Sequence, residues 1–545
     1  MHVFKWTLVA IVVNGALGTS SVWAAPTTPP DAGLIYNQNQ PQLTQPLPST
    51  LPLDLNGKPL KEAKKGGTKV TLDTVTFEGN TVYSSKELQT ATGFQKGTAY
   101  DLAGLQQLAN QVSQFYRSHG YTFASSVLPP QKLGNHTLVI RVIEGHYGKV
   151  TAKSAQPRIE KTAQAYLAPL KPGDVIQSQS LERQLLLLKD LPGVDVTPVL
   201  SPGQAIGTGD LTVAVKPGQR VHGAVSSDNY GSRYSGEYRG RVALSVNRVL
   251  MVGDELSIAG LYSDEDTWLG SLHYALPVGH NGLRAHIGYD HTDYQLGHGF
   301  EGYTGTADIY SAGTTFPVVR SQNSNVSLSA TVQYKHLDDD ISMFDYRRKA
   351  RSESVPLAVI FDHRDNLLGG GVTWGQFALT PGKIKTDETD TDEAKSGFTK
   401  WNLSLSRLQN VGKGVSLYGH VSGQWADHES IDGSESFYLG GPSGVRAYPV
   451  GEGSDARGYI SQIEMRYAVI QHVSPYLFWD TGFAPSGGID TGDNRYLSGA
   501  GLGVRAQYKG VQLDTAVAWR LSGDDSLSDD EQRDPRIWFN VGYQF

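Results

Sequence analysis

The sequence contains no cysteine in its 545 residues, which excludes disulfide bonds and thiolate metal sites. Its 15 histidines occur in neither a His-x₃-His nor an H-E-x-x-H spacing, and serine, histidine and aspartate show no arrangement beyond chance. The formal net charge of −7 argues against a general nucleic-acid-binding protein. We therefore predict a protein that is not an enzyme and that needs no metal, no other cofactor and no nucleic-acid partner.

Long apolar runs are also missing, except near the N-terminus. Lys5 precedes an apolar run at residues 8–17, and Val-Trp-Ala at 22–24 ends it with a pattern typical of a cleavage site. The run is shorter than the ~20 residues of a spanning helix, so residues 1–24 are predicted to be a secretory signal peptide rather than a membrane anchor. The rest of the chain is then either exported and soluble or inserted in a membrane as a β-barrel.

Glycine, tyrosine and tryptophan are abundant, with 62, 27 and 9 residues, as in all-β architectures with many turns. The length predicts two or more domains. Residues 25–67 are rich in proline and glutamine and are predicted to form an extended linker. Within this linker, one short helix can form over residues 31–38, before Pro41.

Two α/β modules of similar plan follow the linker. In residues 68–145, apolar periodicity indicates a strand near 70–77, a helix that begins after Asp101 and a strand near 138–142. Residues 146–218 repeat this order of elements. We therefore predict an internal repeat of two α+β modules.

The pattern changes from residue 219 to residue 545. Apolar and polar residues alternate in short segments, for example at 326–334, 511–519 and 537–545, and aromatic residues lie near the ends of several segments. About ten alternating residues are enough for a tilted strand that spans a membrane. At ~20 residues per strand and connection, this region predicts an all-β antiparallel transmembrane barrel of about 16 strands.

One connection in this region is unlike a surface hairpin. Residues 440–449 read Gly-Gly-Pro-Ser-Gly-Val-Arg-Ala-Tyr-Pro, and we predict that this loop folds back into the barrel. Arg446 would then meet an acidic partner on the wall. Asp480 shares one strand face with Phe478, and a carboxylate that faces lipid is costly. Asp480 should therefore point into the lumen and form a bidentate pair with Arg446.

Alternation also assigns the faces of another segment. Glu464 and Arg466 should point into the lumen. The residues expected on the lipid side are Leu477, Trp479, Ile463, Met465 and Tyr467. The plainer alternative is that Arg446 is a solvated loop residue and that Asp480 is one of many lumen charges.

Two further motifs have plain interpretations. Gly-Ala-Gly-Leu-Gly at 499–503 lies in a strand pattern with no helix after it, so we predict that it is not a phosphate-binding loop. The acidic run at 386–393 lacks the glycine and the final glutamate of an EF-hand. We predict a solvated loop there rather than a calcium site.

Several motifs resemble a known family. Phe-Glu-Gly-Asn-Thr at 77–81, Phe-Tyr-Arg-Ser-His-Gly-Tyr at 115–121 and Val-Ile-Glu-Gly at 142–145 resemble the first polypeptide-transport-associated (POTRA) domain of two-partner secretion transporters. These transporters are the haemolysin secretion/activation proteins of the ShlB/FhaC/HecB family. The second module resembles their second POTRA domain through Pro-Gly-Asp at 172–174 and Leu-Lys-Asp-Leu-Pro-Gly at 188–193.

The barrel region carries signatures similar to those of the same family. The V-R-G-[YF] loop motif is matched by Val445, Arg446, Ala447 and Tyr448. The F-x-D-x-G strand motif is matched by Phe478, Asp480 and Gly482. Ala447 departs from the family pattern because it stands where the motif has glycine, so the backbone there must suit an alanine.

The resemblance implies a transporter in the outer membrane of a Gram-negative bacterium, with both POTRA domains in the periplasm. It would export, and could help to activate, a large β-helical partner such as a haemolysin, an adhesin or a contact-dependent toxin, without nucleotide hydrolysis. The POTRA domains would bind the partner's N-terminal secretion domain. The barrel would contact outer-membrane lipid and would need the barrel assembly machinery for insertion. Some members have a plug helix in the pore, for which only residues 31–40 have room here.

Other functions fit the sequence less well. An outer-membrane insertase of the same superfamily would usually carry more than two periplasmic modules, and only two fit before residue 219. A passive porin needs no such modules. A soluble binding protein needs no arginine loop directed into a barrel. The sequence therefore favours the transporter.

Overall fold

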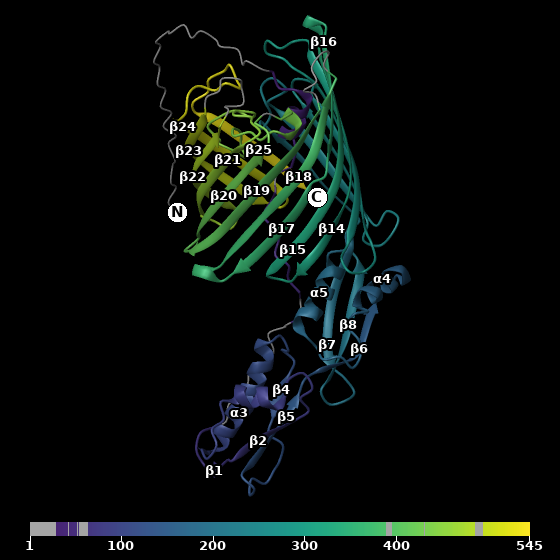
Figure 1. The fold of residues 1–545 in the computed structure, drawn as a ribbon, viewed down its shortest axis with the longest axis vertical. Helices are drawn as coiled ribbons and strands as arrows, with labels where there is room; N and C mark the ends of the chain where they lie inside the picture. The colour runs from purple at the N-terminus through teal and green to yellow at the C-terminus, as the bar shows by residue number, and fades with distance from the viewer. Residues whose placement is uncertain are drawn as a thin grey trace, which may run out of the picture.

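The structure, a computed structural model, describes residues 29–41, 43–51, 53, 64–387, 395–429, 431–485 and 494–545. The predicted signal peptide and residues 388–393 of the acidic run lie outside the described residues. Figure 1 shows three parts: a β-barrel, one α/β module directly beneath it and another α/β module farther away.

The first module, far from the barrel, is a three-stranded sheet with two helices. Its elements are β1 Val70–Thr71, β2 Thr74–Glu78, α2 Ser85–Thr92, β3 Ala99–Tyr100, α3 Leu102–Ser118, β4 Ser125–Val127 and β5 Thr137–Ile143. In the sheet, β2 is parallel to β5 and β4 is antiparallel to it. Asp101 caps α3 by accepting a hydrogen bond from Gly104 N at 2.8 Å. The apolar face of α3, with Leu108 and Val112, is buried in the module's core.

The apolar pattern of the sequence does not indicate helix α2. Only Leu88 and Thr92 of its eight residues are buried, so the helix has no clear apolar stripe. A different sequence signal marks its start. The Ser84 side chain accepts from Glu87 N, and Glu87 Oε2 accepts from Ser84 N at 2.8 Å. This capping box is the feature that predicts the helix.

The motifs that resemble a POTRA domain meet at one buried carboxylate, that of Glu144. Its side chain has no exposed surface. It accepts hydrogen bonds from Thr81 N at 2.6 Å, Val82 N at 2.8 Å and the Tyr116 hydroxyl at 2.7 Å. Burial acts to raise the pKa of Glu144, but these hydrogen bonds outweigh burial and hold the pKa below its ordinary value. Glu144 thus joins the end of β5 to the turn after β2 and to α3.

Replacing Glu144 with glutamine is expected to destabilise the first module by about 3 kcal/mol, because hydrogen bonds to a charged acceptor are worth ~1.5–3 kcal/mol each. The stabilisation by Glu144 should be present above its ordinary pKa of 4.5 and should be lost as the pH falls through the lowered folded value. Hydrogen exchange of residues 70–145 in the full-length protein measures both effects. Glu78→Gln is the matched control, since Glu78 is half exposed. Unchanged protection in the Glu144 variant would contradict the prediction.

The second module repeats the plan of the first. Its elements are β6 His146–Lys153, α4 Pro157–Leu167, α5 Ser178–Lys189, β7 Val194–Pro202 and β8 Thr208–Pro217. Again one strand is parallel to the central strand (β6 to β8) and the other is antiparallel (β7 to β8). The core is built from the leucine-rich face of α5, including Leu181, Leu185 and Leu188, packed against the sheet. Apart from the short pair β1–β3 of the first module, the order strand–helix–helix–strand–strand is shared by both modules.

A closed antiparallel barrel forms the remainder of the chain. Its strands are β9 Val221–Asp228, β10 Arg239–Asn247, β11 Glu255–Ser263, β12 Trp268–Pro277, β13 Arg284–Gln295, β14 Tyr303–Arg320, β15 Ser324–Ile341, β16 Tyr346–Ser354, β17 Leu357–Asp365, β18 Gly371–Thr386, β19 Lys395–Gly412, β20 Val415–Ala426, β21 Gly458–Tyr467, β22 Val473–Ala484, β23 Arg495–Tyr508, β24 Val511–Ser522 and β25 Arg536–Gln544. Among the described residues of the connections, there are 3₁₀ turns at η1 Ser342–Phe344, η2 Leu367–Gly369 and η4 Gly433–Glu435.

The number of strands follows from the pairing. Strands β16 and β17 both pair with β15 and both pair with β18, so they are two halves of one strand. Strand β25 pairs with β9 and closes a ring of 16 strands. The predicted antiparallel barrel of about 16 strands is confirmed.

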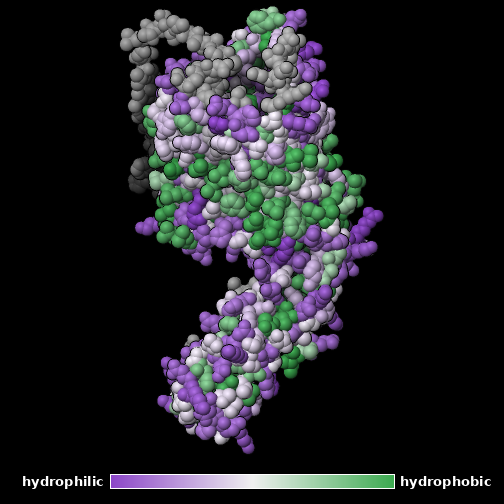
Figure 2. All heavy atoms as spheres, viewed as in Figure 1, coloured by the Kyte–Doolittle hydropathy of each residue, from purple (hydrophilic) through white to green (hydrophobic). Residues whose placement is uncertain are grey.

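The apolar strand faces lie on the outside of the barrel. Figure 2 shows a broad hydrophobic band across the visible face of the barrel, between more hydrophilic ends. All residues expected on the lipid side are exposed on the barrel surface: Leu477, Trp479, Ile463, Met465 and Tyr467. A band of this kind suits the hydrocarbon layer of a bilayer. None of the described helices is long and apolar enough to cross a membrane.

Helix α1 (Ala32–Gln38) lies inside the barrel. Asp31 caps its first turn, and Ile35 is fully buried against side chains of β13, β14 and β15. On its other side α1 contacts η4. Gly33 permits this contact, because a Cβ at this position would lie 2.6 Å from Ser434 Cβ. The sequence indicates a helix at this place, and the structure adds that the helix occupies the lumen.

Candidate functional site: the loop inside the barrel

The loop that carries Arg446 spans residues 427–457, between β20 and β21. Arg446 is buried, with 4% of its surface exposed. Its guanidinium binds Asp480 through Nε–Oδ2 at 2.8 Å and Nη2–Oδ1 at 2.7 Å, a bidentate pair. Nη1 donates to Glu464 Oε1 at 2.7 Å. Asp480 belongs to β22 and Glu464 to β21, so one arginine fixes the loop to two strands of the wall.

Two aromatic residues complete the surroundings of Arg446. The Phe478 ring lies under the guanidinium, with its centroid 3.7 Å from Cζ, a cation–π contact that is stronger when water is excluded. Trp538 on β25 donates from Nε1 to Arg446 O at 2.7 Å. Phe478 belongs to a sequence motif, whereas Trp538 belongs to none and is 92 residues from the arginine. Residues on β21, β22 and β25 thus fix Arg446 in place.

Glu464 joins three arginines into one network. Besides Arg446, it accepts from Arg466 Nη2 at 2.7 Å and from Arg505 Nη1 at 2.8 Å. Arg505 also binds Asp514 at 2.8 Å. Arg466 therefore lies in the lumen beside Glu464. Arg505 and Asp514 carry no motif, although alternation along β23 and β24 assigns both side chains to the lumen.

The other residues of the two barrel motifs pack around this centre. Val445 is fully buried against Gly482, where a Cβ would lie 3.1 Å from Val445 Cγ2. Tyr448 is also fully buried, and its hydroxyl donates to Ser522 O at 3.1 Å. Gly482 therefore has a packing role, since a side chain at this position would press on the loop.

Ala447, the residue that departs from the family motif, lies against a glycine. A Cβ at Gly499 on β23 would be 2.5 Å from the Ala447 methyl group. Gly501 leaves room in the same way for the Phe478 ring, whose nearest atom would be 2.5 Å from a Cβ there. Ala447 itself has no positive φ, so its backbone suits an alanine. Gly499 and Gly501 thus form the part of the wall against which the loop and Phe478 pack.

Replacing Gly499 with alanine is expected to lower the population of the docked loop about tenfold. Overpacking costs ~1–3 kcal/mol, and ~1.4 kcal/mol is a tenfold effect. The double variant Ala447→Gly/Gly499→Ala should recover to within about twofold of the wild type, since it moves one methyl group from the loop to the wall. The measurement is the accessibility of the loop to added protease, normalised to the amount of folded barrel. Absence of rescue in the double variant would contradict this packing.

A second buried residue, Glu452, also fixes the loop, and no sequence motif marks it. Glu452 on the same loop is fully buried. It binds Arg495 at 2.7 Å and accepts from Ser526 Oγ at 2.8 Å and Ser528 N at 3.0 Å. These contacts tie the loop to the connection between β24 and β25. The only local signal is Gly-Glu-Gly at 451–453, which does not by itself indicate burial.

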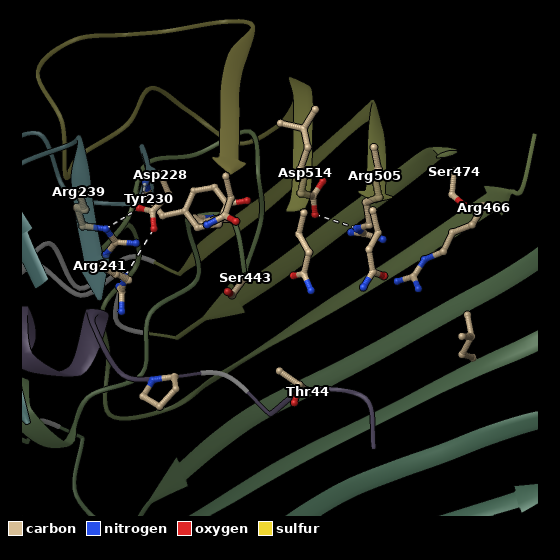
Figure 3. Close-up of a pocket in the computed structure, with 18 of the residues that line it drawn as sticks. Thr44, Asp228, Tyr230, Arg239, Arg241, Ser443, Arg466, Ser474, Arg505 and Asp514 are labelled. Carbon is tan, nitrogen blue, oxygen red and sulfur yellow. Dashed lines mark hydrogen bonds and ion pairs between the residues drawn. The ribbon is translucent and has the colours of Figure 1, made fainter. Parts of the chain in front are cut away.

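A cavity of about 830 Å³ lies beside the loop in the lumen (Figure 3). Its charged lining residues are Asp228, Arg239, Arg241, Arg466, Arg505 and Asp514. Thr44 of the linker and Ser443 of the loop also line it. Within the part of the chain that the structure describes, no group of three or more His, Asp or Glu residues is placed to hold a metal ion. The cavity is thus a space inside the barrel whose lining mixes charged side chains with apolar ones such as Val450 and Leu513.

The closed barrel with its apolar band, the inward loop and the α/β modules define an outer-membrane β-barrel protein with periplasmic POTRA domains. A family model described as haemolysin secretion/activation protein ShlB/FhaC/HecB matches residues 207–506, and a model of the ShlB-type POTRA domain matches residues 70–145. The chain belongs to the haemolysin secretion/activation family.

Named relatives and a solved structure agree with this assignment. The heme/hemopexin transporter protein HuxB of Haemophilus influenzae (strain 86-028NP) is 26% identical over 402 residues, which are 71% of each chain. The outer membrane transporter CdiB of Dickeya dadantii (strain 3937) is 23% identical over 480 residues, 84% of each chain. The structure of CdiB from Escherichia coli matches with a TM-score of 0.71 at 21% identity, covering 90% of this chain and 94% of that chain. At this identity the structural likeness shows the fold.

Proposed function

We propose that this protein exports a large partner protein across the outer membrane by two-partner secretion. Its membership of the haemolysin secretion/activation family carries the proposal, and the relatives HuxB and CdiB are named as transporters. Residues 68–145 and 146–218 act as two POTRA domains that bind the N-terminal secretion domain of the partner. The barrel of residues 219–545 then conducts the unfolded chain, and no enzymatic step is needed.

The lumen suggests which segment moves during export. Both α1 and the loop of residues 427–457 occupy it, so a passing chain must displace one of them. The loop is fixed by buried ion pairs of Arg446 and Glu452. Helix α1 is held by apolar packing and by hydrogen bonds at both ends, from Ala32 N to Asp339 Oδ1 at 2.8 Å and from Asn37 Nδ2 to Ser436 O at 2.6 Å. Its ion pair, Asp31 with Arg348 at 3.5 Å, is more exposed than the ion pairs of the loop. We therefore assign α1 as the plug that leaves and the loop as the part that stays.

Capture of an unfolded partner suits the sheets of the two modules. Each sheet has three strands, so its outer strands can accept an additional strand through backbone hydrogen bonds. Such pairing depends little on the partner's sequence. The proposal also includes contact of the apolar band in Figure 2 with outer-membrane lipid and insertion of the barrel by the barrel assembly machinery.

Deletion of the gene tests the function directly. We expect the loss of one very large protein from the culture medium, with the remaining secreted proteins and the envelope unchanged. Re-expression from a plasmid should restore that protein. General envelope defects, with many outer-membrane proteins reduced, would instead indicate an insertase and would contradict the proposal.

A further inference from the structure

Residues 43–51 of the linker that follows α1 lead from the barrel lumen to the second module, whereas residue 52 and residues 54–63 lie outside the described part. Thr44 lines the cavity in the lumen. Seven residues farther on, Leu51 is buried in the core of the second module, with 8% of its surface exposed. The linker therefore joins the lumen to the second module.

The contacts along this path are made mostly to the linker backbone. They are Arg364 Nη2 to Pro46 O, Arg320 Nη1 to Ser49 Oγ at 3.0 Å, Lys189 Nζ to Thr50 O, and Leu51 N to Gln322 Oε1 at 3.1 Å. Three of the four involve a carbonyl or an amide of the linker backbone; every residue type supplies the carbonyl, and every type except proline supplies the amide N–H. Recognition of this kind tolerates other sequences in an extended chain.

A cavity lies beside the same stretch of linker and is lined in part by Pro46 and Ser49, which are five and two residues before Leu51. It measures about 290 Å³, and its apolar lining includes Tyr166, Leu187 and Leu191 of the second module and Pro317 of the barrel. Leu47 of the linker is at its edge, yet its surface is 88% exposed. The junction between the second module and the barrel thus offers apolar space that the linker itself leaves unused.

We propose that this junction is a binding site for an extended segment of the exported protein, with an aliphatic side chain at the position that Leu51 occupies here. The proposal rests on the export function above. Residues 45–51 are the resident occupant of the site, and the partner replaces them. Because the linker leads from this site to the lumen cavity, a segment bound in its place is aligned with the entrance of the barrel.

Tethering explains why the site is filled before the partner arrives. A segment joined to its site by a short flexible chain has an effective concentration in the millimolar range. A free peptide therefore competes poorly with the linker. A partner already held by the modules is tethered in the same way, so it can compete.

The test uses a fluorescent peptide with the sequence of residues 45–53, added to the full-length transporter in detergent. A transporter with Leu51→Ser should bind the peptide at least about tenfold more tightly than the wild type, because its own segment has lost its anchor. The same peptide with serine in place of Leu51 should not bind. Equal binding by wild type and variant, or no binding to either, would overturn the proposal.

The matched control is Leu47→Ser, a leucine of the same segment that is exposed. It should bind the peptide as weakly as the wild type. The N-terminal fragment of the exported protein, identified by the deletion experiment, should displace the peptide from the Leu51→Ser transporter. Peptide binding without such displacement would overturn the proposal and leave the export function standing. If deletion removes no secreted protein, the export function itself fails, and this proposal fails with it.

Discussion

Replacement of Arg446 with alanine is expected to reduce export of the partner protein by at least about 100-fold while the barrel still forms. Arg446 neutralises the buried carboxylates of Asp480 and Glu464. Removing one member of a buried ion pair costs ~3–5 kcal/mol, which is a factor of roughly 150 to 4,000 in the population of the docked loop. The strand pairing of the barrel does not involve this side chain, so its assembly should persist.

Export is measured as the partner protein in the medium, and barrel formation as the heat-dependent shift in gel mobility. Arg457→Ala is the matched control, since Arg457 lies on the same loop and its acidic neighbour Glu429 is exposed and 3.8 Å away. Export by this control should stay within about twofold of the wild type, because surface ion pairs contribute ~0–1 kcal/mol. Normal export by the Arg446 variant would show that its ion pairs do not set the active position of the loop.

Replacement of Gly33 with valine is expected to open the pore. A Cβ at Gly33 would lie 2.6 Å from both Cβ and N of Ser434, and backbone atoms of η4 cannot move aside cheaply. Helix α1 should then leave its place in the lumen. We expect about a tenfold higher sensitivity to a large antibiotic that the outer membrane normally excludes, and higher conductance in planar bilayers.

The control for this change is Leu43→Val, on the same linker but exposed. Its permeability should equal that of the wild type. If the Gly33 variant remained as closed as the wild type, α1 would not be the element that blocks the lumen. The Arg446 variant, by contrast, should lose export whether or not the pore leaks.

Local patterns in the sequence predicted the fold well. Period-two alternation indicated the barrel and placed Asp480 and Glu464 inside it, where the structure has both buried. The start of α3 followed from its cap, Asp101. Helix α2 was missed because its apolar stripe is weak, and its capping box at Ser84 was the better signal.

The candidate site was predictable only in part. The pair of Arg446 and Asp480 was proposed from alternation and from the resemblance to a family. Trp538, which donates a hydrogen bond to the backbone of Arg446, was not predicted, since no sequence pattern in β25 indicates a contact with residue 446. Glu452 was missed for a related reason. Its partners lie on a distant connection, and a glutamate between two glycines looks exposed.

The sequence alone determined which residues face the lumen. In a membrane-spanning strand, a side chain has only two directions, and the cost of a charge in lipid selects one of them. The partners that meet inside depend on the register of the closed ring and on the path of the inward loop, which are properties of the whole chain. Only the tertiary structure could therefore place Ala447 on Gly499, Glu464 among three arginines and Leu51 in the second module.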